Sequence, residues 1–196
     1  MMVRRYSTIA FLVVCIAAAG LLAYRYRVLW LPEREHESDV LHRRFTPKPA
    51  KVRAHLYFSD ADHRYLTSEV RPLALPDSVV LRARKIIDAL IQGPEGPLTP
   101  TVPPGTKLLA LQITPDGIAY LDFNRAITEN HPGGTLSELL TIFSVVNTLA
   151  VNIPEIQAVK ILVGGREAET LAGHIDIRFP FRPDMRMIQH PASDTG

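Results

Sequence analysis

The feature that most constrains the fold is an 18-residue stretch, residues 136–153, that is apolar on nearly every side of the helix it predicts. It reads "LSELLTIFSVVNTLAVNI" and is followed by Pro154, which ends a helix. A helix that is apolar all round must be buried, and burial needs a second layer of structure. Thr135 and Glu138 at its start have the spacing of a capping box. We therefore expect a domain in which this helix packs across a sheet.

The rest of the chain supplies that sheet and a second helix. Residues 52–58 alternate between apolar and polar side chains, as a strand half-buried in a sheet does. Residues 79–92 place their apolar side chains in one helical stripe, after Asp77 or Ser78 as N-cap. These patterns predict an α+β fold, a single mostly antiparallel sheet with two helices packed on one face, in the order β-β-α-β-β-α-β-β. The elements are expected at residues 52–58, 65–75, 79–92, 107–113, 118–123, 136–153, 158–163 and 175–181.

The N-terminal 31 residues differ from the rest of the chain. An apolar run at residues 9–24 is flanked by arginines on both sides. A spanning helix needs ~20 apolar residues, and aliphatic and aromatic side chains extend this run to residue 31. We expect residues 1–31 to be a membrane anchor; a cleaved signal peptide that ends near "AAAG" is the alternative.

Cys15 raises a third alternative, a lipoprotein. Lipidated cysteines usually follow a small residue and end the apolar run, whereas here Val14 precedes Cys15 and the run continues. A short N-terminal tail stays in the cytoplasm more easily than a large domain does. The expectation is a single-pass protein of the cytoplasmic membrane, with its C-terminal domain on the extracytoplasmic side. Cys15 is the only cysteine, so this domain has no disulfide framework.

The chain divides by composition into four parts. After the anchor, residues 32–51 are charged, bounded by prolines and without periodicity, which is typical of a linker. Residues 52–181 carry the predicted elements, and residues 182–196 form a C-terminal tail. Nine Lys/Arg against four Asp/Glu give residues 1–51 a charge of +5, whereas eleven against fourteen give residues 52–181 a charge of −3. A nucleic-acid partner is not expected, because it needs basic side chains clustered on the folded domain.

The stretch "VKILVGGREAETLAGHID", residues 159–176, contains glycines and acids that invite a functional interpretation. Gly164, Gly165 and Gly173 lack the spacing of a dinucleotide-binding loop, and no Gly-Lys-Ser/Thr of a P-loop follows. We interpret Gly164 and Gly165 as a turn with positive φ, and Gly173 as a second turn or bulge. No cofactor is expected.

The acids of this stretch could serve general acid/base catalysis together with His174. Their alternation along a hairpin is more typical of a solvated face, and no catalytic residue is assigned. The candidate acids are Glu167, Glu169 and Asp176.

The sequence shows only weak patterns for a metal site or for a catalytic nucleophile. Neither the linker histidines nor the turn at residues 60–63 has the spacing of a metal-ligand set, so no metal is assigned. These side chains are His36, His42, Asp60, Asp62 and His63. No Gly-x-Ser-x-Gly elbow occurs. Asn147 and Thr148 are polar within the apolar helix; they could contact a ligand, but we favour a bond from Asn147 to a loop backbone.

Eight short stretches, in one order, resemble the GerMN (sporulation and spore germination) domain family over about residues 52–180. They are LYFSD (56–60), EVRPL (69–73), ALIQGP (89–94), VPPGTKLL (102–109), DGIAYLDF (116–123), GGTLSE (133–138), VVNTL (145–149) and VKILVGGREAETLAGHID (159–176). The resemblance implies a small α+β domain on the outer side of the cytoplasmic membrane, similar to the ring-building modules of secretion machinery. The family has no established catalytic residues, so none is transferred.

These inferences predict an anchored, non-catalytic envelope module that binds or scaffolds envelope proteins, peptidoglycan, or components of sporulation and germination. Self-association into a homo-oligomer is left open. Two alternatives remain. The first is a cell-wall hydrolase that uses acids of residues 167–176. The second is a small-ligand binder whose pocket is walled by the proline-rich loop at residues 93–106.

Overall fold

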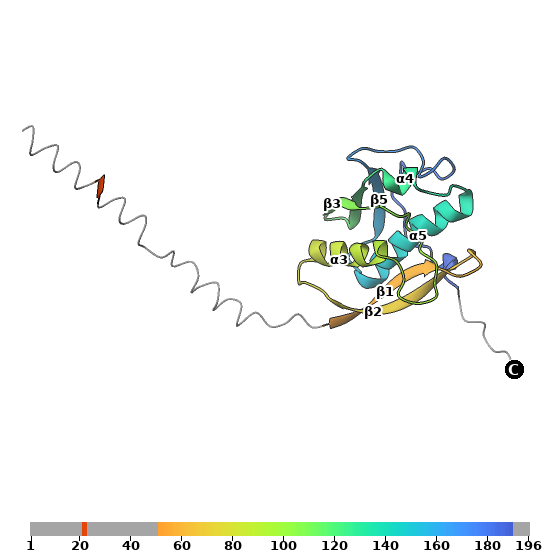
Figure 1. Ribbon diagram of the computed structural model, residues 1–196, viewed down its shortest axis with the longest axis horizontal. Helices are drawn as coiled ribbons and strands as arrows, with labels where there is room; N and C mark the ends of the chain where they lie inside the picture. The colour runs from red at the N-terminus through yellow and green to blue at the C-terminus, as the bar shows by residue number, and fades with distance from the viewer. Residues whose placement is uncertain (1–20, 23–50, 190–196) are drawn as a thin grey trace, which may run out of the picture. The chain divides into compact units, whose positions relative to one another are not determined.

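The computed structural model describes residues 21–22 and 51–189, and the α+β class is confirmed (Figure 1). The predicted anchor, apart from Leu21 and Leu22, and the linker up to residue 50 lie outside the described residues, with Cys15, His36 and His42. The elements are β1 (Lys51–Ser59), β2 (Leu66–Ala74), α3 (Val79–Ile91), β3 (Leu108–Ile113), β4 (Ile118–Phe123), α4 (Ala126–Glu129), α5 (Thr135–Asn152) and β5 (Ala158–Val163), followed by a 3₁₀ turn, Met185–Met187.

The strands form two sheets, where the sequence predicts one. β1 and β2 make an antiparallel pair, while β4 lies between β3, which is antiparallel to it, and β5, which is parallel to it. Figure 1 shows α3 and α5 between the two sheets, so the helices do not cover one face of a single sheet. The sheets stay separate because the free edge of β1 is occupied by α5, as described below.

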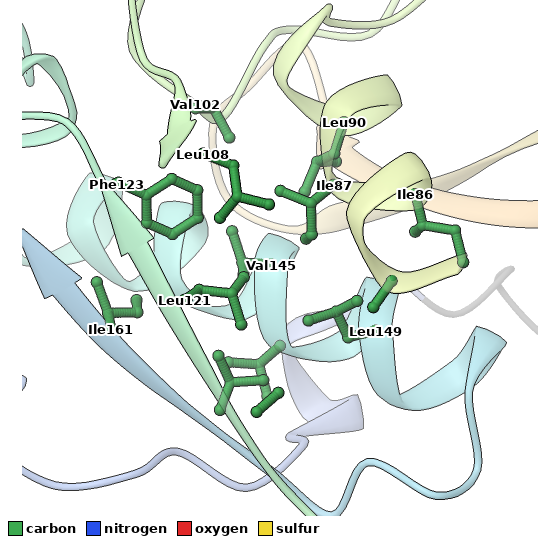
Figure 2. Packing of buried hydrophobic residues seen from close by; sticks show 14 of the residues in the cluster. Ile86, Ile87, Leu90, Val102, Leu108, Leu121, Phe123, Val145, Leu149 and Ile161 are labelled. Atoms are coloured by element: carbon green, nitrogen blue, oxygen red, sulfur yellow. The ribbon is translucent and has the colours of Figure 1, made fainter. Parts of the chain in front are cut away.

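The core is built between these layers, and the predicted burial of the long apolar helix is confirmed. Side chains of α3, α5, β4 and β5 point toward one another in Figure 2. Ala83, Ile86, Ile87 and Leu90 form the buried stripe of α3, and the hydroxyl of its N-cap Ser78 accepts from the Leu81 N–H. The buried residues of α5 include Leu140, Ile142, Val145, Val146 and Leu149, but also Glu138, Thr141, Ser144, Asn147 and Thr148.

Polar side chains of α5 bind the edge of β1 that faces away from β2. The Asn152 amide accepts a hydrogen bond from the His55 N–H (2.9 Å) and donates one to the His55 carbonyl (2.7 Å). The Thr148 hydroxyl accepts from the Tyr57 N–H (3.1 Å). Unpaired backbone groups at a sheet edge must find partners when they are buried. The helix therefore substitutes for a neighbouring strand, and β1 cannot join the other sheet.

A tight turn joins β3 to β4, in the gap between the strands predicted at residues 107–113 and 118–123. Gly117 has φ 82°, and a Cβ atom at this position would lie 2.6 Å from the carbonyl oxygen of Glu155. Only glycine fits both the left-handed conformation and this close approach. The Gly117 carbonyl in turn accepts from the Gln157 N–H (2.8 Å), which positions the start of β5 beside β4.

An ion pair on β2 fixes the chain after α3. The Arg71 guanidinium is buried, bonds to Glu69, and donates to the carbonyls of Ala89 (3.3 Å) and Gly93 (3.0 Å) at the end of α3. The Glu69 carboxylate accepts from the N–H groups of Glu95 and Gly96, both at 3.0 Å. These bonds satisfy carbonyls that a helix end leaves without partners. They also fix the direction in which the proline-rich loop leaves α3.

The predicted last strand, residues 175–181, is not formed as such. This segment makes only isolated bridges, Thr170 with Asp176 and Val159 with Phe181. Pro180 has no N–H to give to a ladder, and the Lys160 ammonium occupies the carbonyls of Ile177 and Arg178. The chain therefore runs beside β5 as an irregular segment.

The edge bonds predict the effect of removing one acceptor. Thr148→Val keeps the volume of the side chain but leaves the buried Tyr57 N–H without a partner, which should lower the free energy of unfolding by about 1–3 kcal/mol. Urea denaturation measures this change, and hydrogen exchange at the Tyr57 amide should accelerate. Thr148→Ser keeps the hydroxyl and should leave the Tyr57 amide protected. Equal exchange at Tyr57 in both variants would show that this bond does not stabilise the edge.

Candidate binding groove

A groove of about 620 Å³ lies between the proline-rich loop and the first half of α5. Residues 99–104 form one wall, and residues 130–133 with the α5 residues Leu136, Ser137, Leu140 and Thr141 form the other. Ser59 and His63 complete the lining. The volume falls in the range of ligand pockets. We call this feature the proline groove.

Hydrogen bonds hold the loop wall in place. Thr99 exchanges two backbone bonds with Ser59, at 2.9 and 3.0 Å, and so continues the edge of β1 beyond the reach of α5. The Thr101 hydroxyl donates to Ser144 (2.8 Å), and its carbonyl accepts from the Thr141 hydroxyl (2.6 Å). Because these contacts come from the buried helix, the wall is set by the core.

The opposite wall depends on His131. The Gly133 N–H donates to His131 Nδ1 (3.0 Å), so the ring proton is on Nε2, which lies 3.0 Å from the Thr141 hydroxyl. Burial lowers the pKa of His131, although the charge of Glu138 acts in the opposite direction. His131 therefore lines the groove as a neutral ring.

The lining carries no Asp, Glu, Lys or Arg among the described residues. Four prolines and the aliphatic side chains of Val102, Leu136 and Leu140 make most of it apolar. Hydroxyls, the two histidine rings and Asn130 supply a few polar groups. Leu136 is 45% exposed, in the first turn of a helix that is more than half buried. Such a surface suits an uncharged, largely apolar occupant.

The stretch at residues 159–176 forms turns on a different part of the domain. Gly164 and Gly165 have φ angles of 60° and 78°, and the Gly165 N–H donates to the Asp122 carboxylate (2.8 Å). Gly173 has φ 110°, and its N–H donates to the Thr170 hydroxyl (3.1 Å). The N–H groups of Gly165 and Gly173 therefore have hydrogen-bond partners within the domain.

Two of the candidate acids in this stretch have separate basic partners. Glu167 lies 3.2 Å from the Lys160 ammonium. Asp176 accepts a hydrogen bond from the Arg178 guanidinium (2.8 Å). This bond, together with a second one from the Arg178 backbone N–H, lowers the pKa of Asp176 to about 2. The charge of Glu169 acts on Arg178, whose pKa it helps to raise, and its backbone carbonyl accepts from the Ile177 N–H. A general acid needs a raised pKa, which is opposite to the shift at Asp176.

Glu138 has a role that the sequence analysis missed. The predicted capping box is wrong, because α5 begins after Gly134 and has no side-chain cap. The fully buried Glu138 carboxylate instead accepts from the His174 ring (2.7 Å) and from the N–H groups of His174 and Ile175 (3.2 and 2.9 Å). Burial acts to raise the pKa of Glu138, but the bonds from Ile175 and His174 outweigh it, and the pKa is lowered. An acid inside an apolar helix could have indicated such a partner.

Lys160 and Asn147 serve the irregular segments in the same way. The Lys160 side chain is almost fully buried, and its ammonium donates to the carbonyls of Ile177 (3.3 Å) and Arg178. The buried Asn147 amide accepts from the Asp184 N–H (3.0 Å) and donates to the Asp184 carbonyl (2.9 Å). Both side chains bind backbone.

The turn at residues 60–65 is held by its own acids. Asp60 accepts from the N–H groups of Arg64 (2.8 Å) and Tyr65 (3.2 Å), and Asp62 pairs with the Arg64 guanidinium (3.0 Å). Over residues 21–22 and 51–189, no three His, Cys, Asp or Glu side chains gather closely enough to hold a metal ion.

One described helix, α5, is long and apolar enough to cross a membrane by length and composition. More than half of it is buried within the domain, where it packs against α3 and β1. It is therefore the core helix of the folded part.

Comparisons with known proteins agree on one family. A model of the family described as "Germane: Sporulation and spore germination" matches residues 55–169. The chain is similar to a protein of Clostridium perfringens described as a candidate lipoprotein (30% identity, TM-score 0.50, 68% of this chain and 88% of that one). It is also similar in fold to the first GerMN domain of the Bacillus subtilis sporulation protein GerM (23% identity, TM-score 0.53, 69% of this chain and 98% of that one). The tandem GerMN domains of that protein are similar as well (21% identity, TM-score 0.50, 69% of this chain and 46% of that one). No curated protein matches the chain.

The Glu138 contacts predict a pH dependence of stability. The folded-state pKa of Glu138 lies below its unfolded value, so its contribution is present above about pH 4.5 and is lost as the pH falls through the folded pKa. Glu138→Gln places an amide NH₂ against N–H donors and should lower the free energy of unfolding by about 2 kcal/mol near pH 7. The difference from the wild type should shrink toward pH 3 in urea titrations. The exposed Glu129→Gln is the control; a Glu138→Gln difference that does not change with pH would contradict this assignment.

Proposed function

The chain belongs to the Germane (sporulation and spore germination) family, and from this premise we propose that it is a membrane-anchored, non-catalytic binding module of the cell envelope. Its binding surface is the proline groove, and its partner is an uncharged, largely apolar segment of another envelope protein. The observation that carries this proposal is the absence of Asp, Glu, Lys and Arg from the groove lining in the described part of the chain.

The chemistry of the groove favours binding over catalysis. A hydrolase needs an acid or base whose pKa suits proton transfer, beside the place where substrate is held. The acids with strong contacts lie elsewhere: Glu138 holds a loop, and Asp176 pairs with Arg178. Two histidines line the groove: His131 has both nitrogens engaged, with Gly133 and Thr141, and His63 lies in the turn at residues 60–65.

The choice of an uncharged protein segment follows from the lining. Charged partners would leave their charges without counterparts in an apolar groove, which costs free energy. Prolines present rigid, apolar rings that lose little entropy on binding, and Leu136 offers an exposed aliphatic side chain at the rim. Surface apolar side chains grouped around a groove are typical of interaction sites.

The location of the module rests on the N-terminal segment and on one relative. Residues 9–24 form an apolar run with basic flanks, and the Clostridium perfringens relative is described as a candidate lipoprotein. We propose a single-pass anchor that holds the domain on the extracytoplasmic side of the cytoplasmic membrane. Partners related to sporulation or germination would be consistent with the family.

A small-ligand binder is the second candidate. A volume of about 620 Å³ with a few polar groups fits the ordinary range of small-molecule sites. In that case a ligand would raise the melting temperature of the full chain through its binding energy, and a partner protein would not be needed.

The groove can be tested by photocrosslinking in native membranes. A photoreactive amino acid at position 136 of the full chain should yield one discrete adduct with an envelope protein. Mass spectrometry should map the crosslink to an uncharged segment of that protein. The matched control places the same amino acid at position 109, because Leu109 is similarly exposed (51%) but lies on β3 outside the groove.

The controls decide between the candidates. Adducts of similar yield from positions 136 and 109 would count against the groove. An adduct with peptidoglycan would replace the protein partner by the wall polymer. Release of peptidoglycan fragments by the purified full chain would overturn the non-catalytic assignment.

A further inference from the structure

The chain after residue 181 folds back over the domain and covers a separate apolar cluster. We call residues 182–189 the strap. Ile188 pairs in parallel with Leu66 at the start of β2, and the Gln189 N–H donates to the Leu66 carbonyl (2.8 Å). The Thr67 hydroxyl also contacts the Gln189 amide oxygen (3.2 Å). The strap thus begins a third strand on the outer edge of β2.

The apolar contacts of the strap come from two neighbouring side chains. Met187 and Ile188 pack against the buried Tyr57, Leu66 and Leu140, a cluster separate from the main core. No residue of the strap is itself buried, and Met185 is 42% exposed. The domain therefore supplies a formed apolar surface, and the strap lies on its outside.

The polar contact at the other end of the strap involves only backbone groups of the strap. Asn147 bonds to both the N–H and the carbonyl of Asp184, at 3.0 and 2.9 Å, while the Asp184 carboxylate is turned toward Arg186. An amide that bonds to both backbone groups of one residue can hold an extended segment of another sequence equally well. Asn147 is fully buried, so it needs such a partner at all times.

In the part of the chain that the structure describes, the edge of β2 continues past the strap without a neighbouring strand. His55 and Tyr57 direct their backbone groups to α5, so their partners across the ladder, Val70 and Ser68, direct theirs away from β1. A longer segment could pair with these residues as far as Pro72. The chain's own sequence is poorly suited to do so, since Pro191, two residues after Gln189, has no N–H to donate.

The strap also lies outside the part of the chain that matches the family. That match covers residues 55–169, which contain the cluster, Asn147 and the β2 edge, but not residues 182–189. The surface therefore lies within the residues that match the family model, whereas the strap lies outside them.

We propose that this surface is a second docking site, for an extended segment of a partner protein that carries two adjacent aliphatic or thioether side chains. The strap occupies the site in cis and competes with that segment. A partner strand would take the place of Ile188 and Gln189 beside Leu66, place its apolar pair against Tyr57 and Leu140, and extend along Ser68 and Val70. This site is distinct in its ligand from the proline groove and does not depend on that assignment.

The site can be opened by changing the strap alone. In the full chain, Met187→Asp with Ile188→Asp removes the apolar contacts of the strap and leaves the site residues intact. A fluorescent peptide with the sequence of residues 183–190 should bind this variant at least ten-fold more tightly than the wild type, where the tethered strap competes at high effective concentration. Met185→Asp, which changes an exposed strap residue outside the cluster, should bind the peptide as weakly as the wild type does.

A second peptide and a measurement on the wild type complete the test. The same peptide with Asp in place of Met187 and Ile188 should not bind the opened variant. Hydrogen exchange at the Gln189 amide of the wild type should be at least 100-fold faster than at the Tyr57 amide, because the strap opens locally. If the variant does not fold, the ratio of the exchange rates at Gln189 and Tyr57 in the wild type tests the proposal.

Three results would overturn the proposal. The first is a folded variant that does not bind the peptide. The second is a Gln189 amide protected as strongly as Tyr57, which would make the strap an integral part of the fold. The third is a wild-type dimer that the opened variant loses, which would show that the strap is exchanged with a second copy of the chain.

Discussion

The structure depends on the hydrogen bonds that one buried helix makes with the backbone around it. Helix α5 is apolar enough to be placed in the core, and its few polar side chains do not bond to one another but mostly to segments without regular structure. Asn152 and Thr148 bind the β1 edge, Thr141 binds the proline-rich loop, and Asn147 binds the strap. Burial makes each of these bonds costly to lose. The helix therefore orients the loops that form both candidate binding surfaces.

The buried charges follow the same rule. Glu138 accepts from N–H groups of the segment at residues 174–175, Lys160 donates to carbonyls at residues 177–178, and Arg71 donates to the carbonyls that end α3. A charge bonded to backbone groups of opposite polarity is stabilised where an isolated charge would not be. These side chains therefore have structural partners, and the domain keeps its irregular segments in place without a disulfide in the part described.

Features that depend on neighbouring residues could be predicted from the sequence, whereas contacts between distant residues could not. The α3 stripe, the β3–β4 turn and the burial of α5 could be predicted, because each depends on the period or the turn residues of one segment. The capping box was wrong, since Thr135 and Glu138 have the right spacing but the Glu138 carboxylate finds donors 36 residues away. The groove was anticipated only in part: the sequence indicates a proline-rich loop, while its other wall comes from His131 and α5.

The sequence by itself determined the α+β class, the buried helix and the family, because periodicity, turn residues and short motifs are properties of neighbouring positions. Only the tertiary structure decided that the strands form two sheets, and that the last predicted strand is an irregular segment. It also decided which polar side chains meet which backbone groups. The physical reason is that a sheet edge or a buried carboxylate can be satisfied by many donors and acceptors, and packing in three dimensions selects among them.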